Sequence, residues 1–144
     1  MKLVDANILI SAYDSRSPHH RLAREWLEEA WSGDEPVGLA WATVLAFVRL
    51  TTSPRILTSP FSLEECCSIV SGWLDQPVVA IVDATERHWS VLREQIVRAQ
   101  AGGPLAMDAH LAALALEHGA TLVTADRDFS RFHGLETFNP LEED

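Results

Sequence analysis

Apolar residues along the chain form short runs that alternate with longer amphipathic stretches. The short runs suit buried β-strands, and they lie at residues 3–4, 37–41, 77–82, 121–123 and 136–138. The longer stretches repeat apolar residues every three or four positions, which predicts helices near residues 6–12, 18–32, 43–52, 62–74, 85–97, 108–118 and 128–132. Strands that alternate with helices indicate a single α/β domain over residues 1–144, with a small parallel sheet flanked by helices on both faces.

Local signals mark several helix ends. Ser62 and Glu65 have the spacing of a capping box, and Thr43 and Thr85 are candidate N-caps of two other helices. Pro18 suits the first turn of a helix. In the helix after Thr43, the side chains expected to face the core are Leu45, Val48 and Leu50.

Three aspartates stand at junctions between these elements. Asp5 follows the first apolar run, Asp108 opens a helical stretch, and Asp126 follows the run at residues 121–123. Ligands of parallel sheets bind beyond the carboxyl ends of the strands, where Asp5 and Asp126 lie. Carboxylates held close together repel, so one is protonated or a cation neutralises them. Oxygen ligands suit Mg²⁺ or Mn²⁺, and such an ion with open positions is suited to phosphodiester hydrolysis.

Each of these acids also has a purely structural explanation. Asp5 is a possible N-cap, Asp108 suits the first turn of a helix, and Asp126 and Asp128 suit a turn. The structural readings weaken when the three are taken together, because the expected topology brings their loops to one edge of the sheet.

Two polar residues stand beside these acids. Asn7 either orients the Asp5 carboxylate or caps the following helix. Thr124 either places its hydroxyl near Asp126 or simply ends a strand.

Charge and composition narrow the function. The net charge is −10, with eleven lysines and arginines against 21 acids, so the basic stripe of a tight, non-specific nucleic-acid binder is absent. An enzyme that holds one phosphate through a metal, or a protein with a basic partner, remains possible. Four arginines could contact RNA phosphates: Arg49, Arg55, Arg127 and Arg131. No apolar run reaches membrane-spanning length and the N-terminus does not look like a signal peptide, so we expect a cytoplasmic protein.

Other chemistry-bearing residues give no second site. Cys66 and Cys67 are adjacent, so we expect both to be reduced. The six histidines lack zinc-site spacing, and none is assigned as a ligand. Core or subunit contacts are expected, rather than base stacking, for Trp26, Trp31, Trp41, Trp73 and Trp89.

The segments around the three aspartates resemble the PIN-domain ribonucleases, and more narrowly the VapC-type toxins of bacterial toxin–antitoxin pairs. The segments that carry the resemblance are Leu3-Val4-Asp5-Ala6-Asn7, Met107-Asp108-Ala109-His110-Leu111-Ala112-Ala113-Leu114-Ala115 and Leu122-Val123-Thr124-Ala125-Asp126-Arg127-Asp128-Phe129, and the terminal Gly134-Leu135 and Asn139-Pro140-Leu141 also fit. The resemblance implies a Mg²⁺- or Mn²⁺-dependent endoribonuclease that hydrolyses RNA with metal-activated water. It also implies a homodimer inhibited by a VapB-type antitoxin protein. It makes Asp5, Asp108 and Asp126 the metal-site acids and Asp128 a fourth catalytic acid, supported by Asn7 and Thr124.

One position departs from the family pattern. The family usually has a glutamate early in the helix after the second strand, but residues 41–49 contain no acid. Ala46 is the expected equivalent, and Phe47 is the second candidate.

Two other functions remain open. The missing acid supports a degenerate PIN domain that only binds a protein or RNA. A receiver-type phosphoacceptor domain also gathers aspartates at strand ends, but it needs a lysine near the phosphate, and the only lysine here is Lys2.

Overall fold

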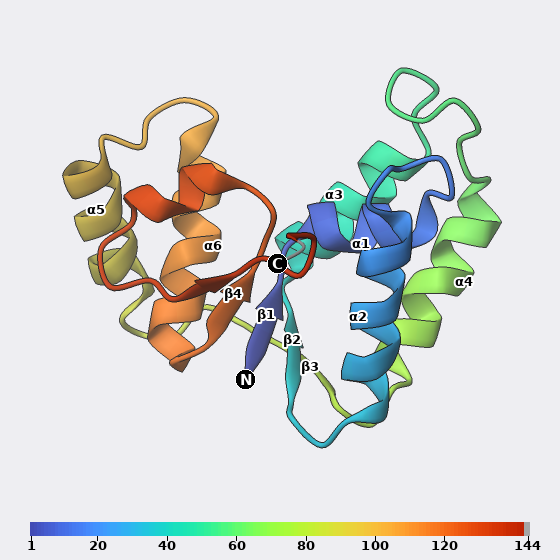
Figure 1. Ribbon diagram of the computed structural model, residues 1–144. Coiled ribbons are helices and arrows are strands. Elements are labelled where there is room, and N and C mark those ends of the chain that lie inside the picture. Colours follow the sequence, from blue (N-terminus) through green and yellow to red (C-terminus); the bar gives the residue numbers. More distant parts are fainter. Residues whose placement is uncertain (143–144) are drawn as a thin grey trace.

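A central parallel sheet organises the protein (Figure 1). The computed structural model describes residues 1–142. Within them the sheet has the order β3-β2-β1-β4-β5, and every pairing is parallel. The strands are β1 (Lys2–Val4), β2 (Val37–Leu39), β3 (Val79–Ile81), β4 (Thr121–Val123) and β5 (Thr137–Phe138). The predicted parallel α/β fold is confirmed.

Helices cover both faces of this sheet (Figure 1). They are α1 (Ala6–Tyr13), α2 (His20–Ser32), α3 (Trp41–Thr51), α4 (Leu63–Leu74), α5 (His88–Ala99), α6 (Leu105–His118) and the 3-10 helix η1 (Arg127–Arg131). Side chains alternate between the two faces along each strand. Leu3 and Leu122 pack with α6 and η1, whereas Val4 and Val123 pack with α1 to α4. The sheet therefore separates two hydrophobic cores.

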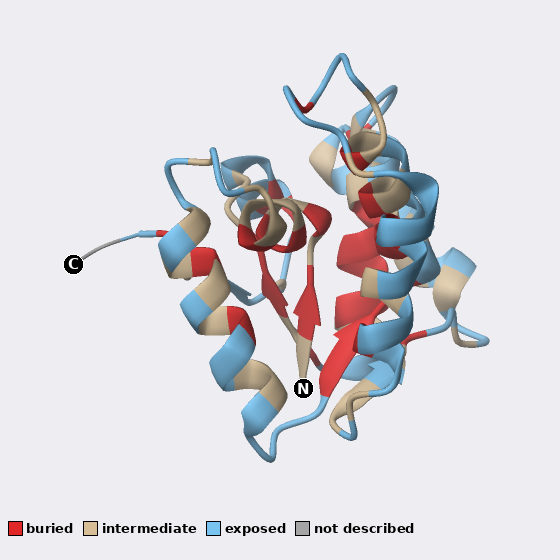
Figure 2. Cartoon of the chain, turned by 90° about the vertical axis from the view of Figure 1, so that its right-hand side faces the viewer, coloured by how far each residue is buried: buried red, intermediate tan, exposed pale blue. Residues whose placement is uncertain are grey.

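The middle of the sheet is buried and its edges are less so (Figure 2). All three residues of β2 are buried, but the side chains of β3 are only half-buried or exposed. Residues 77–82 were expected to be a buried strand. The observed strand is shorter and lies at an edge, where only one neighbour can cover it.

The boundary between β2 and α3 differs from the prediction. The apolar run continues to Trp41, but the strand ends at Leu39 and Ala40 is the helix N-cap. The side chains of α3 that meet the core also differ in part from the prediction, because Val48 packs against the core as expected but Leu45 does not. Thr43 is buried inside α3 rather than capping it, and Leu45 is 65% exposed rather than inward.

Of three other predicted helix starts, one is confirmed and two are wrong. The capping box is confirmed, because Ser62 Oγ accepts from the Glu65 N–H at 3.1 Å and the Ser62 N–H donates to Glu65 Oε1 at 3.3 Å. The predicted start near Pro18 is wrong by two residues, since α2 begins at His20. Thr85 is not the N-cap of α5, which begins at His88.

The tryptophans divide between the core and the surface. Trp73 is buried, contacts Phe47 at a ring-centroid distance of 4.5 Å, and donates its indole N–H to Tyr13 Oη at 2.9 Å. Trp41 and Trp89 are 50% and 67% exposed, so they lie outside the core of this chain, and a subunit contact stays the prediction for them.

The two cysteines differ in their burial. Cys66 is buried, Cys67 is exposed, and both are free thiols. Within residues 1–142, no helix has the length and apolarity that a membrane crossing requires.

Candidate metal centre

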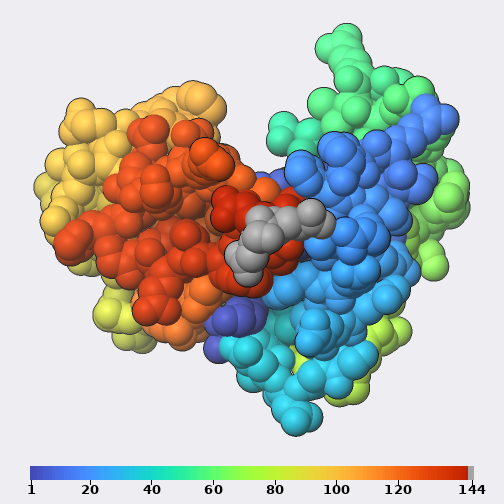
Figure 3. Space-filling model, in the orientation of Figure 1, coloured from blue at the N-terminus to red at the C-terminus, as the bar shows by residue number. Residues whose placement is uncertain are grey.

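The candidate site lies where β1 and β4 end side by side. The neighbours of β1 are β2 on one side and β4 on the other, so the chain changes direction across the sheet here. Such a switch point leaves a crevice beyond the carboxyl ends of the strands. The Asp5 N–H donates to Val123 O at 2.9 Å, which fixes the two strand ends together. Figure 3 shows a hollow between the part of the molecule that carries α5 and α6 and the part that carries α1 and α4.

Asp5 is held tightly at this switch point. Its carboxylate accepts from the Ala6 N–H at 2.7 Å, from Thr124 Oγ1 at 2.7 Å and from Asn7 Nδ2 at 3.3 Å. Burial raises the pKa of Asp5, and the negative charge of Asp126 adds to the effect, whereas the bonds from Thr124 and Ala6 oppose it. Asp5 is therefore both the N-cap of α1 and a member of the acidic group.

Thr124 and Asn7 join the two strand ends. The Thr124 hydroxyl donates to Asp5 and accepts from the Asp126 N–H at 3.0 Å and from Asn7 Nδ2 at 3.3 Å. Asn7 Oδ1 accepts from the Ala125 N–H at 3.3 Å. The hypothesis that Asn7 orients the Asp5 carboxylate agrees with its bond to Asp5 Oδ2, and the Thr124 hydroxyl lies beside Asp126 as its first hypothesis expected. Each residue also bonds to the neighbouring strand end.

Three carboxylates converge in front of this network. One oxygen from each of Asp108, Asp126 and Asp128 lies within 4.8 Å of the other two. Asp108 projects from the first turn of α6, and Asp126 Oδ1 accepts from the Asp128 N–H at 2.9 Å at the start of η1. Asp128 is thus part of the closest group, whereas the Asp5 carboxylate is occupied by hydrogen bonds behind it.

The charges on these acids act on one another. The pKa of Asp108 is raised to about 6, most strongly by burial and further by the negative charges of Asp126, Asp5 and Asp128. Arg131 opposes the shift only in part. The ion pairs found within residues 1–142 join other acids and leave these four without a salt bridge.

This donor set fits a hard divalent cation. Three close carboxylates gain from a cation that neutralises them, since Arg131 offsets the negative charge around Asp108 only in part. Oxygen-only ligands favour Mg²⁺ or Mn²⁺ over metals that prefer nitrogen or sulfur.

The region of the missing glutamate can now be placed. Ala46 lies on α3 and is half-buried. Phe47 is fully buried and packs between Tyr13 and Trp73 in the core on the α1–α4 side. Phe47 is therefore unsuitable as the equivalent of a metal-site acid, which leaves Ala46.

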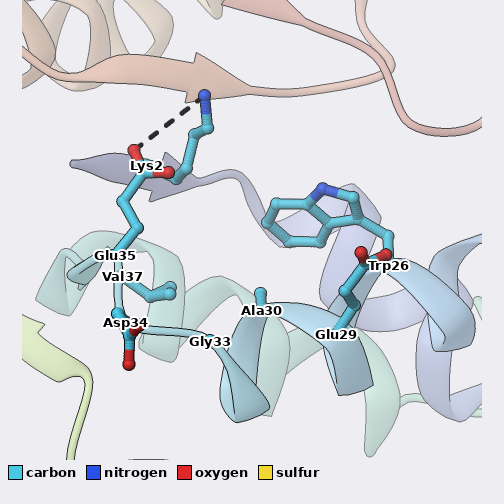
Figure 4. Close-up of a pocket in the computed structure, with 8 residues that line it drawn as sticks. All are labelled: Lys2, Trp26, Glu29, Ala30, Gly33, Asp34, Glu35 and Val37. Atoms are coloured by element: carbon cyan, nitrogen blue, oxygen red, sulfur yellow. Dashed lines mark ion pairs between the residues drawn. The ribbon is translucent and has the colours of Figure 1, made fainter.

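Two cavities lie at opposite ends of the sheet. A cavity of about 360 Å³ adjoins Asp126, and Ser130 and Asn139 line it; nothing in the local sequence marks Ser130. A cavity of about 210 Å³ lies at the amino ends of β1 and β2, where Lys2 Nζ is 4.0 Å from Glu35 Oε1 beside Trp26 (Figure 4). Its distance from the acids makes it unsuitable as part of the same site.

Comparison with known proteins agrees with this geometry. The model of the PIN domain family matches residues 2–135. Ribonuclease VapC37 of Mycobacterium tuberculosis is 42% identical over 140 residues, which cover 97% of each chain. Ribonuclease VapC43 of the same species is 37% identical over 142 residues, covering 99% of this chain and 97% of the relative.

Solved structures show the same fold. VapBC2 from Rickettsia felis, solved bound to a DNA fragment from its promoter, matches with a TM-score of 0.71 at 18% identity, covering 96% of this chain and 97% of that one. VapC20 of Mycobacterium tuberculosis, a toxin that cleaves the sarcin-ricin loop, matches with a TM-score of 0.69 at 17% identity, covering 94% and 99%. The family match and the close relatives, which span nearly the whole chain, show that this protein belongs to the PIN-domain family and, within it, to the VapC group.

Proposed function

We propose that this protein is a Mg²⁺- or Mn²⁺-dependent endoribonuclease that acts as the toxin of a toxin–antitoxin pair. The observation that carries the proposal is the convergence of Asp108, Asp126 and Asp128 within 4.8 Å at the switch point of the sheet. The relatives that match nearly the whole chain are named ribonucleases, which supports RNA as the substrate.

The metal ligands are assigned to Asp5, Asp108 and Asp126, with Asp128 as a fourth acid beside them. When bound, the ion supplies positive charge for the phosphoryl oxygens and lowers the pKa of water. Asp108 has a pKa of about 6, so above that pH the site carries the charge that attracts a cation. Thr124 and Asn7 keep the Asp5 carboxylate in place through their hydrogen bonds.

The other side chains of the site act on the substrate. Asp128 is exposed and close to the other acids, so it can orient water or accept its proton as a general base. Arg127 and Arg131 are exposed on η1 beside the acids, where guanidinium groups can hold RNA phosphates. The phosphodiester is thus held between a basic edge and an acidic centre.

The partner is proposed to be a VapB-type antitoxin. A net charge of −10 and an acidic crevice favour a protein that presents arginine or lysine to the carboxylates. Several structures with this fold are complexes of a VapC with its VapB. We further propose that the toxin is a homodimer and acts in the cytoplasm.

A binding module without catalysis is the second candidate. It is favoured by one observation, the alanine at position 46 where the family usually has a glutamate. A protein that has lost its metal should not be stabilised by Mg²⁺, whereas a ligand that binds the folded state raises the melting temperature.

Cleavage by the partner-free protein tests the proposal. Purified protein is incubated with total RNA in Mg²⁺, in EDTA, and in EDTA followed by excess Mg²⁺, and the product ends are mapped. We expect discrete cleavage sites that disappear in EDTA and return with Mg²⁺. Because water is the nucleophile, the new ends should lack a 2′,3′-cyclic phosphate. Cleavage that persists in EDTA, or none at all from folded protein, would contradict the proposed activity.

A further inference from the structure

A second polar cluster joins α5 to α6 on the side away from the acids. His88 Nε2 lies 2.9 Å from His110 Nδ1, and His88 Nδ1 is hydrogen-bonded to Glu117 Oε2. The Glu117 side chain is fully buried, and the His88 side chain is 16% exposed. Asp108 and His110 are two residues apart on α6, so they point to nearly opposite sides of the helix. The cluster is therefore separate from the candidate metal centre.

The hydrogen bonds define where the protons lie. Glu117 Oε1 accepts from the Thr85 N–H at 2.9 Å and from the Thr85 hydroxyl at 2.7 Å. Burial favours the protonated acid, but the bonds from His88 and Thr85 outweigh it and lower the pKa of Glu117. An ionised Glu117 accepts a hydrogen bond from His88 Nδ1–H. The free lone pair of a neutral His88 is therefore on Nε2. That lone pair faces His110.

A histidine in this state is prepared for metal binding. Histidines that bind metals usually donate their other ring N–H to a carboxylate or carbonyl, which fixes the tautomer and orients the ring. Glu117 has that relation to His88. We propose that His88 Nε2 and His110 Nδ1 form a site for a transition-metal ion of the Zn²⁺ or Ni²⁺ class, with water in the remaining positions.

The two nitrogens are close enough to share one ion, but both rings must turn, because their nitrogens now face each other in a hydrogen bond. Two nitrogens that are each about 2.0–2.1 Å from a metal lie about 2.9 Å apart at a right angle and about 3.4 Å apart in a tetrahedron. The observed separation is 2.9 Å. His110 changes tautomer on binding: the proton leaves Nδ1 and a proton is taken up at Nε2, so the ring stays neutral. Imidazole suits Zn²⁺ and Ni²⁺, whereas the carboxylates suit Mg²⁺, so the two sites select different ions.

Bound metal would join the start of α5 to the middle of α6, which also carries Asp108. An ion that binds only the folded state raises the melting temperature. The site does not depend on ribonuclease activity, so its test and the test of the proposed function can fail separately.

Zinc titration tests the proposal. Zn²⁺ is titrated by calorimetry into full-length Asp108→Asn/Asp126→Asn protein, in which the acidic centre is weakened as a competing site. We expect one equivalent to bind. In the same background, His88→Ala and His110→Ala should each weaken binding at least tenfold, and Glu117→Gln should weaken it by about tenfold or more. His133→Ala is the matched control, because its side chain is exposed and only its backbone bonds to Gln95.

A variant that folds poorly does not remove the test. His110→Gln keeps a polar side chain at that position, and its melting curve with and without Zn²⁺ replaces the titration. Zn²⁺ should raise the melting temperature of the parent and of His133→Ala by a few degrees, and of His110→Gln by much less. Equal Zn²⁺ affinity in the His88 and His110 variants, an equal loss in His133→Ala, or no binding to the parent would each overturn the proposed site.

Discussion

Replacing Asp108 by asparagine should stabilise the metal-free protein at neutral pH. In the folded chain the pKa of Asp108 rises from 3.8 to about 6, through burial and the negative charges of Asp126, Asp5 and Asp128. A shift of that size corresponds to at most about 3 kcal/mol of unfavourable free energy when the group is ionised. The side chain is half-exposed, so solvent screening reduces the effect to roughly 1 kcal/mol. For a chain of this length that is about 2–4 °C in melting temperature.

The raised pKa of Asp108 determines how the stability advantage of the variant changes with pH. The pKa of Asp108 is higher in the folded chain than in the unfolded chain. The protonated acid therefore stabilises the folded state, and this stability is fully present below about pH 4. That stability is lost as the pH rises through 6. Asparagine cannot ionise. The melting temperature of Asp108→Asn should therefore exceed that of wild type most above pH 7 and equal it near pH 4.

Melting curves in EDTA between pH 4 and 8 provide the measurement. Asp83→Asn is the control, since Asp83 is exposed in the loop after β3. In saturating Mg²⁺ the order should reverse, because wild type keeps a metal ligand that the variant lacks. The reasoning is refuted if Asp108→Asn is no more stable than wild type at pH 7.5 in EDTA, or if its advantage is equally large at pH 4.

Three further predictions follow from the same site. Ala46→Glu should tighten Mn²⁺ binding by about tenfold, on the scale of about 1.4 kcal/mol for one added charge, and unchanged affinity in a folded variant would show that position 46 faces elsewhere. Thr124→Val removes a donor to Asp5 and an acceptor for the Asp126 N–H. It should cost about 1–3 kcal/mol in denaturant unfolding and weaken Mg²⁺ binding, whereas Thr51→Val, at a buried threonine bonded to Phe47 O, should cost stability alone. Purification from the native source should recover a small protein rich in arginine or lysine that blocks cleavage, and a free, active toxin without a stable partner would count against that expectation.

The meeting of Asp5 and Asp126 could be predicted because the topology of the sheet decides it. Asp5 and Asp126 each follow a strand, and parallel strands end at a shared edge. The sequence did not predict which of the acids lie closest together. Asp128 joins Asp108 and Asp126 in the closest group, while Asp5 is engaged by Asn7 and Thr124. That depends on side-chain directions in the turn at η1, which local pattern does not encode.

The error at the end of β2 comes from the composition of the apolar run. Residues 37–41 are uniformly apolar, so nothing in them marks the end of β2 at Leu39. The buried face of α3 carries Val44 and Phe47, so Leu45 is exposed, while Val48 packs against the core as expected. Likewise, His88 and His110 meet only through the packing of α5 against α6, so spacing along the sequence could not reveal the pair.

We propose that Asp5, Asp108 and Asp126 serve one metal-dependent cleavage reaction. The most direct test is the cleavage rate of a single RNA in Mg²⁺ by Asp5→Asn, Asp108→Asn and Asp126→Asn. The fold of each variant is checked by melting, and Asp34→Asn, at an exposed acid beside the opposite cavity, is the control. Each of the three variants should be folded and inactive while the control cleaves like wild type. Two of the three cleaving at the wild-type rate would contradict the assignment.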